Sequence, residues 1–238
     1  MAETLGIILP TINECENLKI LYPSLRAAFP AAKILVIDDG STDGTLEYLD
    51  QIERNDENLS SLQRGVRLGI GSAHLEGMRN AILQNLTYVL TMDADGTHSV
   101  EDARKLFLSR HVSNLIIGSR YLKGASIRGW SIFRILLTYG GHFVTTLAFF
   151  SRLDMSSGLR LYRTDEIPLS NLQRNCPPNY EFFFASILVY KKIGLQINQV
   201  PIRLEARGSG ESKMTFGLMR RGVYRLFLYT TRIKRIKL

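Results

Sequence analysis

The sequence predicts an α/β protein with a mostly parallel sheet that is covered by helices on both faces. Short apolar runs alternate with stretches of helical spacing through the first half of the 238-residue chain, a pattern typical of strand–helix units. The runs at residues 34–37 and 88–92 are apolar and end abruptly in acidic residues. In such sheets ligands bind beyond the carboxyl ends of the strands, where these acids would lie.

The elements of the first half follow one another closely. We expect strands at residues 5–9, 34–37, 88–92 and 114–118, and helices at residues 14–29, 42–52, 71–84 and 99–109. The first helix repeats apolar residues at helical spacing, namely Leu18, Leu21, Leu25 and Ala28. This alternation of strands and helices favours parallel neighbouring strands.

The second half has a different character. Two strongly apolar helices are expected at residues 131–150 and 180–193, followed by a β-like segment at 195–204 and a basic tail. The first is unusually apolar, but Arg134, His142 and two glycines make it a poor membrane span. We expect both helices to be apolar interface helices.

Composition narrows the function classes. With 30 basic and 22 acidic residues the net charge is +8, while 45% hydrophobic and 22% charged residues are ordinary globular values. A disordered, collagenous or coiled-coil protein is therefore excluded. Cys15 and Cys176 are too few for a disulfide framework and too far apart for a zinc site, which indicates a reducing compartment.

Three polar groups follow the predicted strands, Asn13-Glu14, Asp38-Asp39 and Asp93-Ala94-Asp95. Alternation along an extended segment would point Asp93 and Asp95 the same way. Two such carboxylates repel unless a metal or a donor lies between them, and hard oxygen ligands favour Mg²⁺ or Mn²⁺ shared with substrate phosphates. A lone D-x-D is more often a solvated turn, but three groups at one sheet edge favour a metal bridging to a diphosphate.

The blocks that carry these acids resemble glycosyltransferase family 2 enzymes of GT-A fold, in the dolichol-phosphate mannose synthase-like branch. The matching blocks are PTINECENL at 10–18, IDDGSTDGT at 37–45, RLGIGSA at 67–73, MDAD at 92–95, GSRY at 118–121 and RGSGESK at 207–213. They stand in family order over nearly the whole chain. The resemblance implies transfer of mannose or glucose from a GDP- or UDP-linked donor to a polyprenyl or dolichyl phosphate, with Mg²⁺ or Mn²⁺ as cofactor.

The resemblance also implies a catalytic domain at residues 1–213, divided into a nucleotide-sugar half, 1–119, and an acceptor half, 120–213. Asp93 and Asp95 would hold the metal. The implied substrate contacts are Pro10, Asn13, Glu14, Asp38, Asp39, Gly69, Asp93, Ala94, Thr138 and Ser212. The implied catalytic residues are Asp95, Arg120, Arg134, Arg207 and Lys213. Ile12, Thr97 and Leu159 depart from the family pattern, which bears on the donor's identity more than on the reaction class.

The residue types support a phosphate acceptor independently of the resemblance. A phosphate monoester is already anionic near neutral pH, whereas an alcohol acceptor needs a general base. Arginines match phosphate oxygens with their planar forks, and no base is obvious beside them, although Asp154 and Asp165 are candidates for an alcohol acceptor. Asp154 is rather expected to hold the loop before Gly158. Direct attack on the donor predicts inversion at the anomeric carbon.

The tail, residues 214–238, mixes apolar residues with a basic face and predicts an amphipathic helix on a membrane surface. We therefore expect a cytoplasmic protein, peripheral on the cytoplasmic face of a membrane, with a small membrane-anchoring subunit among its partners.

Other functions fit less well. The letters DADGT at 93–97 match a haloacid-dehalogenase phosphatase, but the later acidic pair of that family is missing. Nucleic acid is not an expected partner, because the chain shows no zinc, helix-turn-helix or RNA-binding signature. A saccharide hydroxyl of a cell-surface polymer remains an alternative acceptor.

Overall fold

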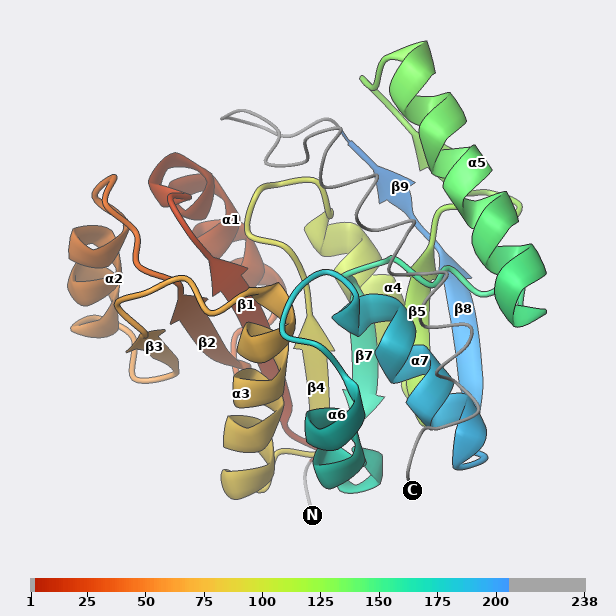
Figure 1. Ribbon diagram of the computed structural model, residues 1–238. Helices are drawn as coiled ribbons and strands as arrows, with labels where there is room; N and C mark the ends of the chain where they lie inside the picture. The colour runs from red at the N-terminus through yellow and green to blue at the C-terminus, as the bar shows by residue number, and fades with distance from the viewer. Residues whose placement is uncertain (1–2, 206–238) are drawn as a thin grey trace.

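Figure 1 shows the computed structural model, which describes residues 3–205 as a seven-stranded sheet between helical layers. The strand order is β3 (Leu59–Gln63), β2 (Lys33–Asp38), β1 (Leu5–Thr11), β4 (Tyr88–Thr91), β7 (Arg160–Arg163), β5 (Leu115–Ser119) and β8 (Ile197–Pro201). Only β7 runs antiparallel to its neighbours in this sheet of the described residues. The predicted mostly parallel α/β architecture is confirmed.

Two helical layers bury opposite faces of the sheet. One contains α1 (Cys15–Ala28), α2 (Thr45–Glu53) and α4 (Val100–Leu108), and the other α3 (Ile70–Leu83), α6 (Leu169–Asn175) and α7 (Phe182–Lys192). Because side chains alternate along a strand, Ile7 and Leu9 of β1 pack into the first layer and Ile8 into the second. Between β7 and α6 lies the short 3-10 helix η1 (Thr164–Glu166).

The two apolar helices predicted in the second half have opposite surroundings. Every residue of α7 from Phe182 to Tyr190 is buried, so α7 is a core helix. In α5 (Ile132–Phe149) only 6% of the helix is buried, and Figure 1 shows it at the periphery of the molecule. By length and composition α5 could cross a membrane, which differs from the poor span expected from its Arg134, His142 and glycines.

Several elements were not predicted. The edge strand β3 reads LSSLQ and has a single buried residue, so it carries no apolar run. β7 and α6 were also missed, and the expected β-like segment at 195–204 divides into β8 and β9 (Arg203–Leu204). β9 pairs with β6 (Ser126–Ile127) in a second small sheet. Because β7 and β8 complete the main sheet, the two expected halves of the chain share one sheet.

The strand register places the predicted acids at one edge. Thr11 at the end of β1 pairs with Asp38 at the end of β2, and Ile8 pairs with Thr91, the last residue of β4. The polar groups that follow these strands therefore lie at the same carboxyl-terminal edge, as the sequence predicted.

Candidate active site

The loops after β1 and β2 are joined into one surface by hydrogen bonds. The backbone N–H of Asn13 donates to Ser41 Oγ over 2.8 Å, and that of Thr42 donates to Asn13 Oδ1 over 2.7 Å. Asn13 has a φ of 52°, and asparagine is among the residues that tolerate this left-handed region. Asn13 thus joins the two loops through these hydrogen bonds. Pro10, which lies close by in β1, is partly buried.

Asp38 and Glu14 are buried and have partners within the same surface. Asp38 Oδ1 accepts from the backbone N–H groups of Gly40 at 2.9 Å and Ser41 at 2.8 Å, and its Oδ2 accepts from the Ser41 hydroxyl. Glu14 Oε2 accepts from Asn17 Nδ2 at 2.5 Å. The contacts of Asp38 support a role in shaping the turn, since its side chain is fully buried.

Asp39 connects this surface to the start of α3. Its Oδ2 accepts from the Gly69 N–H at 3.0 Å and its Oδ1 pairs with Arg64. At Gly69, where φ is +98°, a Cβ would lie 2.5 Å from the Pro178 carbonyl oxygen. Protein packing thus requires glycine at this position, and the substrate contact that the resemblance implies for Gly69 stays a prediction. Arg64 follows the unpredicted strand β3, so sequence reasoning missed it.

Asp93 lies between His98 and Gly158. The backbone N–H of Asp93 donates to His98 Nδ1 over 3.2 Å, and this ring nitrogen of His98 also lies 3.7 Å from Asp93 Oδ2. On the other side, a Cβ on Gly158 would come within 2.9 Å of Asp93 Oδ1. The Asp93 side chain is 32% exposed, so its carboxylate is held by the protein yet reachable by a ligand.

Asp95 has a different environment. The expectation of an extended segment is wrong here, because Ala94 and Asp95 form a turn after β4. Asp95 is buried, and its Oδ1 accepts from the Thr97 N–H at 3.0 Å and from the Thr97 hydroxyl at 2.6 Å. Thr97, which departs from the family pattern, therefore orients Asp95. Ala94 is buried between the two acids.

The donor set of this turn fits a divalent cation. Asp93 and Asp95 offer hard oxygen ligands, and Gly158 leaves beside Asp93 a space that any larger side chain would fill. Within residues 3–205 no group of three or more His, Cys, Asp or Glu side chains gathers to hold a metal. The two aspartates therefore suit Mg²⁺ or Mn²⁺, which bind through one or two carboxylates and take their other ligands from water and substrate phosphates.

Arg120 forms a buried ion pair with Asp154. Its Nε and Nη2 donate to the two carboxylate oxygens over 2.8 and 2.6 Å, and Nη2 also donates to Ser156 Oγ. Burial acts to raise the pKa of Asp154, but the charge and hydrogen bonds of Arg120 outweigh it and the pKa is lowered. For Arg120, burial lowers the pKa and the charge of Asp154 raises it, with a smaller contribution from Asp93, and the net shift is upward. Asp93, Arg120 and Asp154 thus form one charged cluster.

The acceptor-side residues on α5 lie near Trp130 and Tyr121. The Arg134 guanidinium carbon is 3.7 Å from the centroid of the Trp130 ring, and Thr138 Oγ1 donates to the Arg134 carbonyl over 2.8 Å. The Tyr121 hydroxyl donates to the Thr138 carbonyl over 3.3 Å, and its ring stacks on His142 at 3.7 Å. Arg207, Ser212, Lys213 and the expected helix at 214–238 lie outside the described residues.

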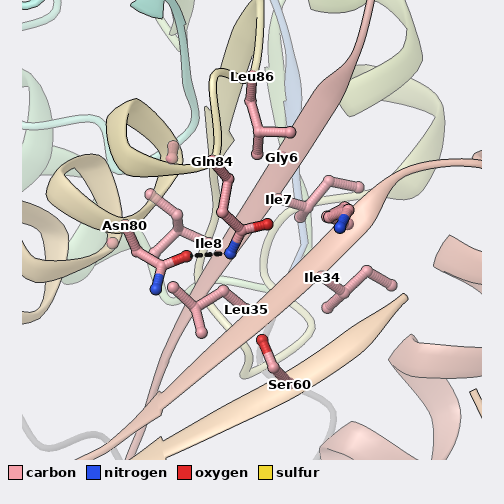
Figure 2. Close-up of a pocket in the computed structure, with 12 residues that line it drawn as sticks. Gly6, Ile7, Ile8, Ile34, Leu35, Ser60, Asn80, Gln84 and Leu86 are labelled. Atoms are coloured by element: carbon pink, nitrogen blue, oxygen red, sulfur yellow. Dashed lines mark hydrogen bonds between the residues drawn. The ribbon is translucent and has the colours of Figure 1, made fainter. Parts of the chain in front are cut away.

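A small pocket lies elsewhere, among residues of β1, β2 and α3 (Figure 2). Gly6, one of its lining residues, pairs with Lys33 at the start of β2, so the pocket is at the amino-terminal ends of the strands. Gln84 Nε2 donates to Asn80 Oδ1 across it, as Figure 2 shows. Its volume of about 10 Å³ is no more than one water needs, so it cannot hold a nucleotide sugar.

Comparison with known proteins decides the family. The sequence profile described as "Glycosyl transferase family 2" matches residues 6–165, which include both aspartates of the turn. The chain belongs to glycosyltransferase family 2. It is 32% identical to the undecaprenyl-phosphate mannosyltransferase of Micrococcus luteus, over 89% of this chain and 88% of that protein. It is 30% identical to the polyprenol monophosphomannose synthase of Mycolicibacterium smegmatis, over 92% and 84% of the two chains.

Solved structures match the fold of this family 2 glycosyltransferase. Glucosyl-3-phosphoglycerate synthase from Mycobacterium tuberculosis in complex with phosphoglyceric acid aligns with a TM-score of 0.70 and 18% identity, over 96% of this chain and 80% of that chain. The same enzyme with Mn²⁺, UDP and phosphoglyceric acid aligns with a TM-score of 0.69 and 19% identity, over 96% and 78% of the chains. At this identity the likeness establishes the GT-A fold alone. The chain is therefore a glycosyltransferase of GT-A fold.

Proposed function

We propose that this glycosyltransferase transfers mannose from a nucleotide sugar to a polyprenyl phosphate, with inversion at the anomeric carbon. The observation that carries the proposal is the pair Asp93 and Asp95 in a turn at the carboxyl-terminal edge, beside the cluster of Arg120 and Asp154. The names of the relatives from Micrococcus luteus and Mycolicibacterium smegmatis support a polyprenyl-phosphate acceptor and mannose over glucose.

On the donor side, Asp93 and Asp95 would hold Mg²⁺ or Mn²⁺. When bound, the ion supplies positive charge that stabilises the departing diphosphate. Asp93 presents a partly exposed carboxylate held between His98 and Gly158, and Thr97 fixes the orientation of Asp95. The joined loops at Asn13 and Asp39 would bind the nucleotide, GDP or UDP, at the neighbouring strand ends.

On the acceptor side, a phosphate oxygen forms a bond to the anomeric carbon. The bond from that carbon to the donor diphosphate breaks, and the nucleoside diphosphate leaves with the electron pair. Because the attacking oxygen is already anionic, no side chain has to remove a proton. Arg134, exposed on α5, is suited to position the acceptor phosphate, while Arg207 and Lys213 stay predictions from the family pattern.

The two candidate bases for a hydroxyl acceptor are unsuited to that task. Asp154 is fully buried, and its carboxylate accepts from Arg120, which lowers its pKa. Asp165 pairs with Arg163 next to the end of β7, where Arg163 stands opposite Tyr88 at the start of β4. Asp165 therefore lies at the opposite edge of the sheet from Asp93. This favours a phosphate acceptor over a saccharide hydroxyl.

The exposed surface of α5 supports a position on a membrane. Its large apolar side chains stand in solvent, with exposed fractions of 77% for Ile132, 65% for Phe133, 65% for Leu136, 63% for Phe143 and 58% for Leu147. A contiguous apolar helix face of this kind is typical of contact with lipid or a partner. A lipid-borne acceptor would be reached from there. We propose the cytoplasmic face, and a membrane-anchoring subunit stays a prediction.

The test is to incubate the protein with Mg²⁺ or Mn²⁺, a panel of radiolabelled sugar nucleotides and polyprenyl phosphate, and then to extract the lipid. We expect label in the lipid fraction from a mannose nucleotide, loss of transfer with EDTA, and loss of transfer in Asp95→Asn. Asp50→Asn, on the exposed side of α2, is the matched control and should transfer normally. Transfer to a saccharide hydroxyl but not to the lipid phosphate would contradict the proposal.

A further inference from the structure

Arg160, the first residue of β7, is a fully buried arginine whose hydrogen-bond partners in the described part of the chain are all neutral. Its side chain is completely excluded from solvent. Nε donates to the Ser157 carbonyl over 2.8 Å, and Nη1 donates to Ser186 Oγ over 2.8 Å. Nη2 donates to the carbonyls of Phe183 at 2.7 Å and Met155 at 3.3 Å. Within residues 3–205, no ion pair includes Arg160.

Such an arrangement is costly for a folded protein. A buried charge without a counterion loses its hydration and gains no Coulombic attraction in return. Burial also brings Arg160 close enough to His74 to lower the pKa of that histidine further. An apolar residue of similar volume would fill this place at lower cost. Four acceptors surround the planar guanidinium, and this arrangement therefore indicates that Arg160 fixes the positions of the segments that carry them.

The acceptors come from two separate parts of the chain. The carbonyls of Met155 and Ser157 belong to the segment of residues 154–158, which precedes β7, whereas Phe183 and Ser186 belong to α7. The Arg160 guanidinium carbon also lies 5.2 Å from the centroid of the Phe183 ring. One side chain thus clamps the segment 154–158 onto the core helix α7.

The clamped segment contacts both charged centres of the candidate site. Gly158 packs against the Asp93 carboxylate, and Asp154 accepts the ion pair of Arg120. The Gly158 carbonyl also accepts from Thr91 Oγ1 at 2.8 Å, which joins the segment to the end of β4. Any shift of residues 154–158 would therefore displace two residues together, namely Gly158, which packs against Asp93, and Asp154, which pairs with Arg120.

Helix α7, the other partner of Arg160, is connected through α3 to the loop of Asp39, which would bind the nucleotide. A Cβ on Gly71 would lie 2.5 Å from the Phe182 Cβ at the start of α7, so α3 and α7 are in close contact there. Two residues earlier, Gly69 donates to Asp39. A continuous set of packed contacts thus runs from Asp39 through α3 and α7 to Arg160 and on to Asp93.

We propose that Arg160 is a positioning residue for the donor site, which fixes Gly158 against Asp93 by clamping residues 154–158 onto α7. The inference rests on the proposed function in one respect, because Asp93 is taken to hold the divalent ion. Arg160 itself is fully buried, so it would act on the ion through residues 154–158 and not by direct contact. Removing the planar guanidinium of Arg160 should let Gly158 and the Asp93 carboxylate move, and it should therefore weaken ion binding.

The experiment compares Arg160→Lys, which keeps the charge but loses the fork, with Ser186→Ala, which removes one acceptor. Arg163→Lys, on the same strand but exposed and paired with Asp165, is the matched control. Free Mn²⁺ is measured by electron paramagnetic resonance in the presence of GDP or UDP. Hydrogen exchange at residues 154–158 and the KM values for donor and polyprenyl phosphate are measured alongside.

We expect Arg160→Lys to weaken Mn²⁺ binding by about 10-fold or more and to speed exchange at residues 154–158. The KM for polyprenyl phosphate should stay within about twofold of the wild type, and Ser186→Ala should show a smaller change in the same direction. Circular dichroism checks that each variant is folded. Should Arg160→Lys misfold, Ser186→Ala decides the question by the same two measurements.

Wild-type Mn²⁺ affinity together with wild-type exchange in the folded variants would overturn the inference. So would a uniform rise in exchange over the whole chain, because that indicates a general loss of stability rather than a local clamp. A wild-type protein that binds no Mn²⁺ with either nucleotide would instead refute the metal in the proposed function. In that case exchange at residues 154–158 decides alone whether Arg160 clamps the segment.

Discussion

Gly158 approaches Asp93 so closely that a Cβ on the glycine would lie 2.9 Å from Asp93 Oδ1. Real Cβ atoms essentially never come this near a neighbour, so the carboxylate has its present position only because residue 158 has no side chain. The glycine belongs to the segment before β7, and the aspartate to the turn after β4. Two distant parts of the sequence therefore determine one carboxylate position.

Gly158→Ala should displace the Asp93 carboxylate and lower sugar transfer by about 10- to 100-fold, with weaker Mn²⁺ binding. The measurements are kcat with saturating substrates and Mn²⁺ affinity. Gly141→Ala is the control, because nothing lies within 4 Å of its added Cβ on α5 and alanine favours a helix by about 1 kcal/mol over glycine. Equal activity of both variants would show that Asp93 need not be where the structure has it.

Asp154→Asn should strongly destabilise the fold, because the largely buried Arg120 guanidinium loses the carboxylate with which it pairs. Breaking a buried pair from one side costs about 3–5 kcal/mol. The exposed pair of Arg163 and Asp165 provides the comparison, since loss of a surface pair costs about 0–1 kcal/mol. Urea unfolding of Asp154→Asn and Asp165→Asn measures both, and similar losses in the two variants would contradict the assignment.

His74 should make the protein sensitive to acid. It is fully buried, and burial, followed by the charges of Arg160 and His98, lowers its pKa from 6.5 to about 3. The unfolded chain therefore binds a proton that the folded protein excludes. Protonation of His74 therefore leaves the free energy of unfolding unchanged above pH 6.5. Below pH 6.5 it lowers this free energy, by about 2 kcal/mol at pH 5.

His74→Leu should remove this part of the decline, because the ring packs between Phe182 and Phe183 and leucine is apolar. The check is urea unfolding between pH 5 and pH 8 for the wild type and the variant. His111→Ala, whose side chain is 62% exposed, should keep the wild-type slope. A wild-type slope in His74→Leu would assign the acid sensitivity to other groups.

Charges on α5 should weaken binding to lipid. Leu136 and Phe143 are exposed on α5, and replacing both with glutamate places charge on the apolar surface and opposes anionic headgroups. We expect binding to vesicles of anionic phospholipid to fall by about 10-fold or more, measured by co-sedimentation. Leu108→Glu on α4, where the leucine is 72% exposed, should bind as the wild type does. Equal binding of all three proteins would exclude α5 as the lipid contact.

The sequence predicted the parts of the fold that have a periodic signal. The alternation of apolar runs and helices gave the parallel sheet, and the acids after the runs gave the edge where Asp93 and Asp95 lie. β3 was missed because its five residues LSSLQ bury one side chain, so it pairs at the edge without an apolar pattern. The turn at Asp95 was missed because the side-chain and backbone hydrogen bonds of Thr97 compete with extended structure there.

The partners within the site were harder to predict than its members. Arg120 was expected at the site, but its ion pair with Asp154 crosses 34 positions of sequence and depends on the tertiary fold. Arg160 ends the segment DMSSGLR at 154–160, which resembles a family block from which only Leu159 departs. The block does not indicate that this arginine is buried, and its contacts with α7 depend on the tertiary fold.

The reversed direction of β7 determines where the chain tolerates change. Because β7 starts beside Thr91, the last residue of β4, the loop that enters β7 is at the reaction edge and the loop that leaves it is at the opposite edge. Lengthening the chain before residue 160 would disturb the reaction edge, whereas lengthening it at Asp165, which is exposed between the buried Thr164 and Ile167, would extend a surface remote from the aspartates. Fusion tags and reporter insertions therefore belong after β7.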